Sequence, residues 1–405
     1  MIVFLGMDTT TPEDAGLSAK RLTRIGTVMQ RYVDQDKLPG VIAVVARCGE
    51  VVYLERFGMM DLEAAKPMQF DTIFRIYSMT KPITSVALMM LYEEGHFQLN
   101  DPVSRFIPEF ADVKVFVGTA EEGFRTTELE REVTIRDLLT HTAGLTYDFF
   151  EDSPVDAMYV DADLHRVDRT LEEMIQKLVT LPLVFQPGSA WRYSMATDVL
   201  GYVIEVISGI RFDEFLEDKI LRPLGMEDTD FYVPGEKLDR LAAAYGPTES
   251  GVIELLDAPA TSQYSKPPRF LSGGSGLVST ASDYMRFAQV LLDNGELDGT
   301  RLLGRKTMRL MTINHLPEEM IPIQVPPHTL HGCGFGLGFR ILVNVAQAGR
   351  LASEGEFGWG GGASTSFFVD PKERLVGLLL TQLIPSRYYP IREEFKVLVY
   401  QALVD

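Results

Sequence analysis

The two ends of the chain each carry a pair of short β-branched, apolar runs around a tight turn. Residues 41–54 are interrupted by a turn at residues 48–50, and residues 366–380 by a turn at residues 370–373. Apolar runs of this kind around turn residues predict β-hairpins. Because each hairpin must bury an apolar face, we expect the two to join in one antiparallel sheet.

The segment between the hairpins carries mostly helical signals. Ser/Thr-x-x-Asp/Glu capping boxes at residues 134–137, 170–173 and 280–283 each precede apolar residues with helical spacing. A further amphipathic helix is expected over residues 199–207, ending at Gly209. There is no internal repeat or low-complexity tract that would divide the chain otherwise.

This order of elements predicts a mixed α/β (α+β) fold. The central antiparallel sheet is formed by the N- and C-terminal segments and is flanked by helices. We expect one α/β domain made of residues 1–95 and 270–405, with a mostly helical domain of residues 96–269 inserted in it. The cleft between the two domains is the expected place of an active site.

Charge and cysteine content limit the partners of such a protein. The formal net charge is −19, from 38 basic and 57 acidic residues, and a surface of this sign repels phosphate backbones and anionic membranes. We therefore expect neither nucleic acid nor a membrane as a partner. Two cysteines are too few for a disulfide framework or a cysteine-based zinc site. The apolar run at the N-terminus ends at Gly6, too short for a signal peptide or a membrane span, which predicts a cytoplasmic protein.

Ser78 and Lys81 stand at the start of a segment with the pattern of a buried helix ending at Gly95. Pro82 fits only the first turn of a helix, so Ser78 is expected at the N-terminus of this one. Residues three apart share a helix face, and the Lys81 ammonium can therefore reach the Ser78 hydroxyl. The pattern rests on the apolar residues Ile83, Val86, Ala87, Met90 and Leu91.

A serine beside a lysine suggests nucleophilic catalysis. The hydroxyl is a weak nucleophile until a neighbour takes its proton, and a lysine can do this only where its ammonium form is disfavoured. The helix N-terminus also stabilises developing negative charge. The Ser-x-x-Lys spacing occurs once here, but one or two chance matches are expected in roughly 400 residues. A helix-capping serine with a solvated lysine is the alternative.

Other catalytic frameworks are missing from the sequence. No serine lies in a Gly-x-Ser-x-Gly elbow, and there is no His-Glu-x-x-His, phosphate-loop or dinucleotide-binding pattern. His328 and His331 are three apart, but the preceding Pro326-Pro327 opposes the helix that such ligand spacing needs. We expect neither a metal nor a cofactor.

Further segments resemble the serine β-lactamase-like and penicillin-binding-protein superfamily, whose first motif is Ser-x-x-Lys. Residues 138–145, Leu-Leu-Thr-His-Thr-Ala-Gly-Leu, look like its Leu-Leu-x-His-Thr-Ser-Gly-Leu segment, and residues 273–277 look like its Gly-Gly-x-Gly-Leu helix entry. Tyr193-Ser194-Met195 matches the second motif, Tyr-x-Asn, except for Met195. The resemblance implies a β-lactamase/transpeptidase-like fold and a catalytic triad of Ser78, Lys81 and Tyr193.

The third motif of that superfamily, Lys-Thr-Gly, is replaced here by Trp359-Gly360-Gly361, which resembles the Trp-x-Gly of the family VIII carboxylesterases. The resemblance implies that these three residues line the substrate pocket, and that the backbone N–H groups of Ser78 and Gly362 form the oxyanion hole. Glycines also let the strand backbone approach a ligand closely. With Met195 and Trp359 the chain lacks the amide-binding asparagine and the carboxylate-binding lysine of β-lactamases, which favours esters.

The sequence therefore predicts a serine carboxylesterase that hydrolyses small to medium esters through an acyl-enzyme on Ser78, with Lys81 and Tyr193 as general base and acid. The alternatives are an acyltransferase, a β-lactamase or D-alanyl carboxypeptidase, and a non-catalytic binding homologue. The aromatic residues between 147 and 159 either wall the pocket or pack against the helical region. No pattern predicts the natural ester, the acyl-chain length or the oligomeric state.

Overall fold

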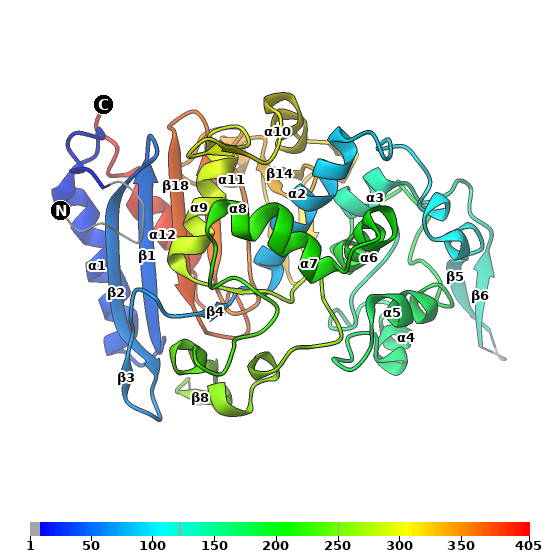
Figure 1. Cartoon of the computed structure of the whole chain (residues 1–405), viewed down its shortest axis with the longest axis horizontal. Coiled ribbons are helices and arrows are strands. Elements are labelled where there is room, and N and C mark those ends of the chain that lie inside the picture. Colours follow the sequence, from blue (N-terminus) through cyan, green and yellow to red (C-terminus); the bar gives the residue numbers. More distant parts are fainter. Residues whose placement is uncertain (1–8, 121–122, 250) are drawn as a thin grey trace.

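The protein is built around one large antiparallel sheet, shown in Figure 1 as a computed structural model that describes residues 9–120, 123–249 and 251–405. Its eight strands run in the order β14-β15-β16-β17-β18-β1-β2-β3, so strands from the two ends of the chain meet in one sheet. The expected mixed fold with a central antiparallel sheet is confirmed. The N-terminal apolar run considered above lies entirely outside the described residues.

Both predicted hairpins are present, and they form the middle of the sheet. β1 (Gly40–Arg47) pairs with β2 (Glu50–Asp61), and β17 (Ser366–Asp370) pairs with β18 (Leu375–Thr381). β1 and β18 then pair along their whole length. The outer strands are β3 (Lys66–Pro67), β14 (Cys333–Phe335), β15 (Arg340–Leu342) and β16 (Phe357–Gly360).

Helices cover both faces of the sheet because successive side chains of a strand point to opposite sides. Val41, Ala43 and Val45 of β1 belong to one hydrophobic cluster with α1 (Ala19–Asp34) and α12 (Ile391–Tyr400). The alternate side chains of β1 belong to a second, larger cluster with α2 (Thr80–Glu93) and α9 (Ala281–Leu292). That second cluster continues into the helical part of the molecule, at the right of Figure 1.

The helical part begins its helices largely where the capping patterns predict. Complete capping boxes open α3 at Thr134 and α5 at Thr170, and α6 ends at Gly209 in the left-handed conformation. At α9 only half of the box forms, because the Asp283 carboxylate accepts from the Asp228 N–H and the Thr229 hydroxyl instead of closing back on the N-cap. The helices of this part are α3 (Ile135–Thr140), α4 (Pro154–Ala162), α5 (Leu171–Leu178), α6 (Ala196–Ser208), α7 (Phe212–Leu216) and α8 (Arg222–Leu224).

Short elements complete the fold. Two hairpins lie within the region predicted as a mostly helical domain, and the division into domains at residues 96 and 269 stays a prediction. The remaining elements are β4 (Phe74–Arg75), β5 (Val115–Ala120), β6 (Gly123–Thr127), β7 (Ala244–Pro247), β8 (Ile253–Asp257), β9 (Val278–Ser279), β10 (Glu296–Leu297), β11 (Thr300–Arg301), β12 (Ile323–Val325), β13 (His328–Leu330), α10 (Arg305–Met311) and α11 (Val345–Ala348).

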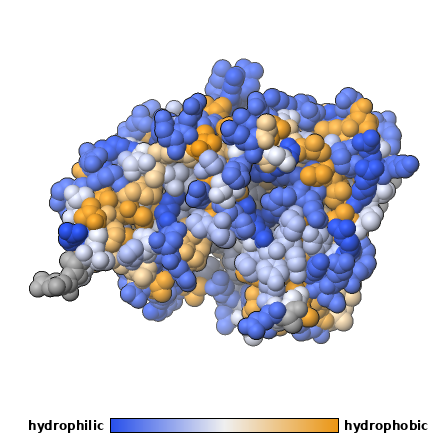
Figure 2. Space-filling view, turned by 180° about the vertical axis from the view of Figure 1, so that it is seen from behind, coloured by the Kyte–Doolittle hydropathy of each residue, from blue (hydrophilic) through white to orange (hydrophobic). Residues whose placement is uncertain are grey.

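Figure 2 shows one face covered mostly by polar residues, with apolar residues in separate patches. Within the described ranges, no helix combines the length and the apolar composition that crossing a membrane requires.

Candidate active site

Ser78 lies where the sequence places it, at the entry of a buried helix. It is the middle residue of a 3-10 turn, Tyr77–Met79, that leads directly into α2. Pro82 occupies the first turn of α2, as its missing N–H demands. The residue before the serine, Tyr77, has a φ of 44°, a left-handed conformation that is costly for a bulky side chain and is concentrated at functional sites.

The Lys81 side chain, only 1% exposed, reaches three polar groups from the first turn of α2. Its Nζ lies 3.4 Å from the Ser78 Oγ, 2.8 Å from the Tyr147 hydroxyl and 2.8 Å from the Gly274 carbonyl oxygen. The predicted pairing of serine and lysine on one helix face is therefore present.

The partners of Lys81 allow it to act as a base. A carbonyl oxygen can only accept a hydrogen bond, whereas the two hydroxyls can donate or accept. As a neutral amine, Lys81 can donate one N–H to Gly274 and one to Tyr147. Its lone pair then remains for the Ser78 proton, across the longest of the three contacts.

Tyr193 is buried beside the lysine, with 5% of its surface exposed. Lys81 Nζ lies 4.5 Å from the centre of its ring, and its hydroxyl accepts a hydrogen bond from the Trp359 indole N–H at 3.3 Å. Within the described residues this hydroxyl is bonded to neither Ser78 nor Lys81. Catalytic hydrogen bonds are often long in unliganded enzymes, and Ser78 and Tyr193 line the same cavity.

The glycine run after Trp359 passes directly against the serine turn. A Cβ on Gly361 would collide with the Ile76 carbonyl oxygen and the Thr365 hydroxyl, so only glycine allows this approach. A Cβ on Gly362 would meet nothing closer than the Tyr77 ring, at 3.6 Å. The predicted pocket residues Trp359, Gly360 and Gly361 line one cavity with Ser78, and Gly362 lines both cavities that reach Ser78.

Tyr147 is a member of the site that sequence reasoning did not count. Its hydroxyl accepts a hydrogen bond from Lys81. Burial, and then the neighbouring Tyr193 and Asp198, hold the pKa of Tyr147 well above its ordinary value. The only signal was its place two residues after the Gly144-Leu145 that ends a family-like segment. A tyrosine in an aromatic run is as common in a core as in a site.

Asp198 is a second residue that was missed. The carboxylate is fully buried on the first turn of α6, where it accepts hydrogen bonds from the Ser272 hydroxyl and the Gly274 N–H. It thereby holds the turn whose Gly274 carbonyl binds Lys81. From the sequence, an acidic residue at this position looks like an ordinary partner of the helix N-terminus.

His141, at the centre of the Leu-Leu-Thr-His-Thr-Ala-Gly-Leu segment, packs behind the site. Its ring lies 5.1 Å from the Tyr193 ring and its Nδ1 lies 3.2 Å from the Ser194 hydroxyl. Burial, together with the charge of Lys81, lowers the pKa of His141 well below its usual range. The imidazole is therefore neutral and supports Tyr193 by packing.

Two cavities open at Ser78. One, of about 300 Å³, has largely aromatic walls that include Tyr147, Phe149, Tyr264 and Phe270. The other, of about 310 Å³, extends past Tyr193 and Trp359. Groups of three or more His, Cys, Asp or Glu side chains placed to hold a metal ion do not occur in the described part of the chain.

Comparisons with known proteins agree on one family. A model of the β-lactamase family matches residues 25–401. The esterase EstB of Burkholderia gladioli is 32% identical over 388 residues, covering 90% of this chain and 91% of EstB. The solved structure of EstCE1, a hydrolase with promiscuous acyltransferase activity, has a TM-score of 0.80 at 28% identity and covers 94% of this chain and 99% of EstCE1. Simvastatin synthase (LovD) of Aspergillus terreus has a TM-score of 0.81 at 25% identity, over 95% of this chain and 98% of LovD.

Proposed function

Because this chain belongs to the β-lactamase family, we propose that it is a serine carboxylesterase of the family VIII type, acting on small to medium esters. The observation that carries the proposal is the buried Lys81, whose Nζ faces the Ser78 Oγ beside a tryptophan-lined pocket. Similarity to the esterase EstB and the hydrolase EstCE1 supports a serine hydrolase in general.

The proposed reaction uses Ser78 as nucleophile. Its Oγ forms a bond to the ester carbonyl carbon while its proton passes to Lys81. The carbonyl oxygen becomes negative and accepts hydrogen bonds from the N–H groups of Ser78 and Gly362. When this intermediate collapses, the bond to the alcohol oxygen breaks, and the alkoxide takes a proton through Tyr193. Water then attacks the acyl-enzyme by the same route and releases the acid.

The preference for esters over β-lactams rests on two substitutions. Trp359 stands where β-lactamases have a lysine, and its indole N–H is engaged with Tyr193. The position after Tyr193-Ser194 carries the thioether of Met195, which is fully buried, and therefore offers no side-chain amide to a lactam. A small ester needs neither the lysine nor the asparagine in order to bind.

An acyltransferase is the second candidate. EstCE1, a hydrolase with promiscuous acyltransferase activity, and simvastatin synthase support it through their similarity to this chain. The aromatic cavity lined by Tyr147, Phe149 and Phe270 also reaches Ser78, is not lined by Trp359, and offers room for an acceptor alcohol. Product analysis with added alcohols separates transfer from hydrolysis.

The test compares Ser78→Ala with Ser85→Ala on a panel of para-nitrophenyl esters and cephalosporins. Ser85 lies on the same helix, and its buried hydroxyl has no hydrogen-bond partner among the residues that the structure describes, so its removal is a matched control. We expect Ser78→Ala to lose ester turnover by at least about 10⁴-fold and Ser85→Ala to keep it. Full turnover by Ser78→Ala would remove the mechanism, and faster turnover of cephalosporins than of esters would make the protein a β-lactamase.

A further inference from the structure

A cavity that adjoins the active-site cavity is lined by cationic side chains. It has a volume of about 580 Å³ and shares Arg340, Arg350 and Arg387 with the smaller cavity that reaches Ser78. The Glu393 carboxylate lines both cavities beside these cations. The Glu356 carboxylate does not line either cavity but pairs with Arg340. We call the larger cavity, together with the adjoining part of the cavity of about 310 Å³, the cationic cavity. Arg340, Arg350 and Arg387 line both, and Arg392 and Lys396 line only the smaller one.

Three basic side chains of the cationic cavity pair with a single carboxylate oxygen. Glu356 is fully buried, and its Oε1 lies 2.6 Å from Arg340, 2.6 Å from Lys396 and 3.2 Å from Arg350. Burial opposes ionisation, but the charges of Lys396, Arg340 and Arg350 hold the pKa of Glu356 down at about 2. One negative charge is therefore shared by three cations.

The remaining donors have spare capacity. The Nε atoms of Arg340, Arg350 and Arg392 are buried and have no hydrogen-bond partner among the described residues. Arg392 is 9% exposed, and its guanidinium donates to the Gly361 carbonyl. Arg387 makes neither a hydrogen bond nor a close ion pair within the described ranges, and the Glu393 carboxylate, which lines the same cavities, balances only part of the positive charge there. Buried donors and charges without partners are costly, so this arrangement suits an anionic ligand.

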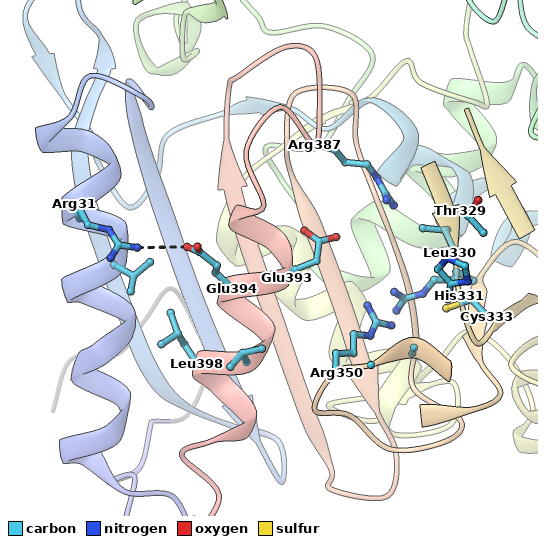
Figure 3. Close-up of a pocket in the computed structure, with 15 residues that line it drawn as sticks. Arg31, Thr329, Leu330, His331, Cys333, Arg350, Arg387, Glu393, Glu394 and Leu398 are labelled. Carbon is cyan, nitrogen blue, oxygen red and sulfur yellow. Dashed lines mark ion pairs between the residues drawn. The ribbon is translucent and has the colours of Figure 1, made fainter. Parts of the chain in front are cut away.

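The side chains converge on a single space. Figure 3 shows Arg350 and Arg387 approaching from two sides into the gap between α12 and the segment from Thr329 to Cys333. Glu393 lies at the edge of the same gap, and Glu394 is turned away to pair with Arg31 at 3.7 Å. Burial, and then the like charge of Arg387, lowers the pKa of Arg392 to about 9. An anion in the gap would relieve this repulsion.

The cationic cavity is continuous with the active site. The cavity of about 310 Å³ is lined by Ser78 and Tyr193 and also by Arg387 and Arg392. Trp359 lies along its wall. A ligand whose ester carbonyl sits at Ser78 can therefore extend past Trp359 to the guanidinium groups.

We propose that the cationic cavity binds a negatively charged group of the substrate itself. Guanidinium groups match the geometry of carboxylates and phosphates. The preferred substrates are then esters with a carboxylate or phosphate at the end remote from the ester bond. The inference rests on the proposed esterase function, and it names the substrate class of that same site.

The kinetic test uses para-nitrophenyl monoesters of adipic, pimelic and suberic acids, each beside its neutral methyl-capped counterpart. We expect wild-type kcat/KM to favour a charged ester of suitable length by about 10- to 100-fold. Arg387→Gln should reduce the ratio of charged to neutral kcat/KM toward one. Arg374→Gln is the control, because Arg374 is half-exposed and pairs with Asp293 away from the cationic cavity.

A binding test separates this inference from the proposed function. Pimelate or inorganic phosphate should raise the melting temperature of Ser78→Ala protein, and should raise it much less when Arg387→Gln is added. Stabilisation without ester turnover by the wild type would remove the esterase and keep the anion site. Ester turnover with no preference for charged esters would overturn the inference, and stabilisation in that case would mark a site for free anions.

Discussion

Lys81 beside Ser78 and the basic residues of the cationic cavity are two sites of positive charge, and their side-chain nitrogens have different numbers of partners. Lys81 Nζ has three polar partners, all supplied by the protein. In the cationic cavity, Arg387 has no such partner among the described residues, and three Nε atoms are unpaired. Groups that must act on a reacting atom are held in place beforehand. The cationic cavity instead leaves binding capacity that a ligand can use.

The largest expected effect concerns the two tyrosines next to Lys81. Tyr193→Phe should lower kcat for ethyl butyrate by about 10²- to 10⁴-fold, because it removes the group that protonates the leaving alkoxide. Tyr147→Phe removes one hydrogen bond to Lys81, worth about 1 kcal/mol, and should lower kcat by only about five-fold.

The leaving group supplies the control for this pair. Nitrophenolate leaves without a proton, so the loss in Tyr193→Phe should be smaller on para-nitrophenyl butyrate than on ethyl butyrate. A larger loss in Tyr147→Phe than in Tyr193→Phe would transfer the acid role to Tyr147. It would also mean that the hydrogen bond between Lys81 and Tyr147 takes part in the proton transfer.

The next prediction concerns the excess of positive charge in the cationic cavity. Glu356→Gln leaves Arg340, Arg350 and Lys396 without their shared carboxylate and should lower the free energy of unfolding by about 3 kcal/mol or more. Urea denaturation at neutral pH measures this. Glu318→Gln, at an exposed position, is the control. Unchanged stability in Glu356→Gln would contradict the imbalance.

The pH dependence of stability follows from the same carboxylate. The pKa of Glu356 is about 2 in the folded protein, below its ordinary value of 4.5. The folded state therefore gains stability that is fully present above the ordinary pKa and is lost as the pH falls from about 4.5 to about 2, amounting to roughly 3 kcal/mol. Glu356→Gln should lack this part of the acid-induced loss.

The parts of the site that the sequence predicts are those set by short spacing. The pairing of Ser78 with Lys81 follows from three residues along one helix, and the hairpins follow from runs around turns. Tyr193 and Trp359 were identified by resemblance to a family. Their placement beside Ser78 in one cavity agrees with it, while their roles stay predictions.

The parts that were missed depend on contacts between distant segments. Tyr147 reaches Lys81 across 66 positions, and Asp198 reaches Gly274 across 76. A tyrosine or an aspartate carries no sign of such a partner in its local pattern. The basic residues of the cationic cavity are spread over several elements with irregular spacing. Whether an arginine points into a cavity or into solvent is decided by packing, which periodicity does not record.

The smallest expected effect concerns the backbone at Gly361, which lies between the active site and the cationic cavity. Gly361 accepts a hydrogen bond from Arg392 and packs against the Ile76 carbonyl oxygen beside the serine turn. The Cβ of Gly361→Ala must displace the Ile76 carbonyl oxygen or the Thr365 hydroxyl, at a cost of about 1–3 kcal/mol, and should lower both the turnover of neutral esters and the preference for charged ones. Gly362→Ala, whose Cβ has room, should cause a smaller loss in both measurements. Equal losses at the two positions would show that close packing at Gly361 does not couple the regions, because the adjacent, roomier glycine would then matter as much.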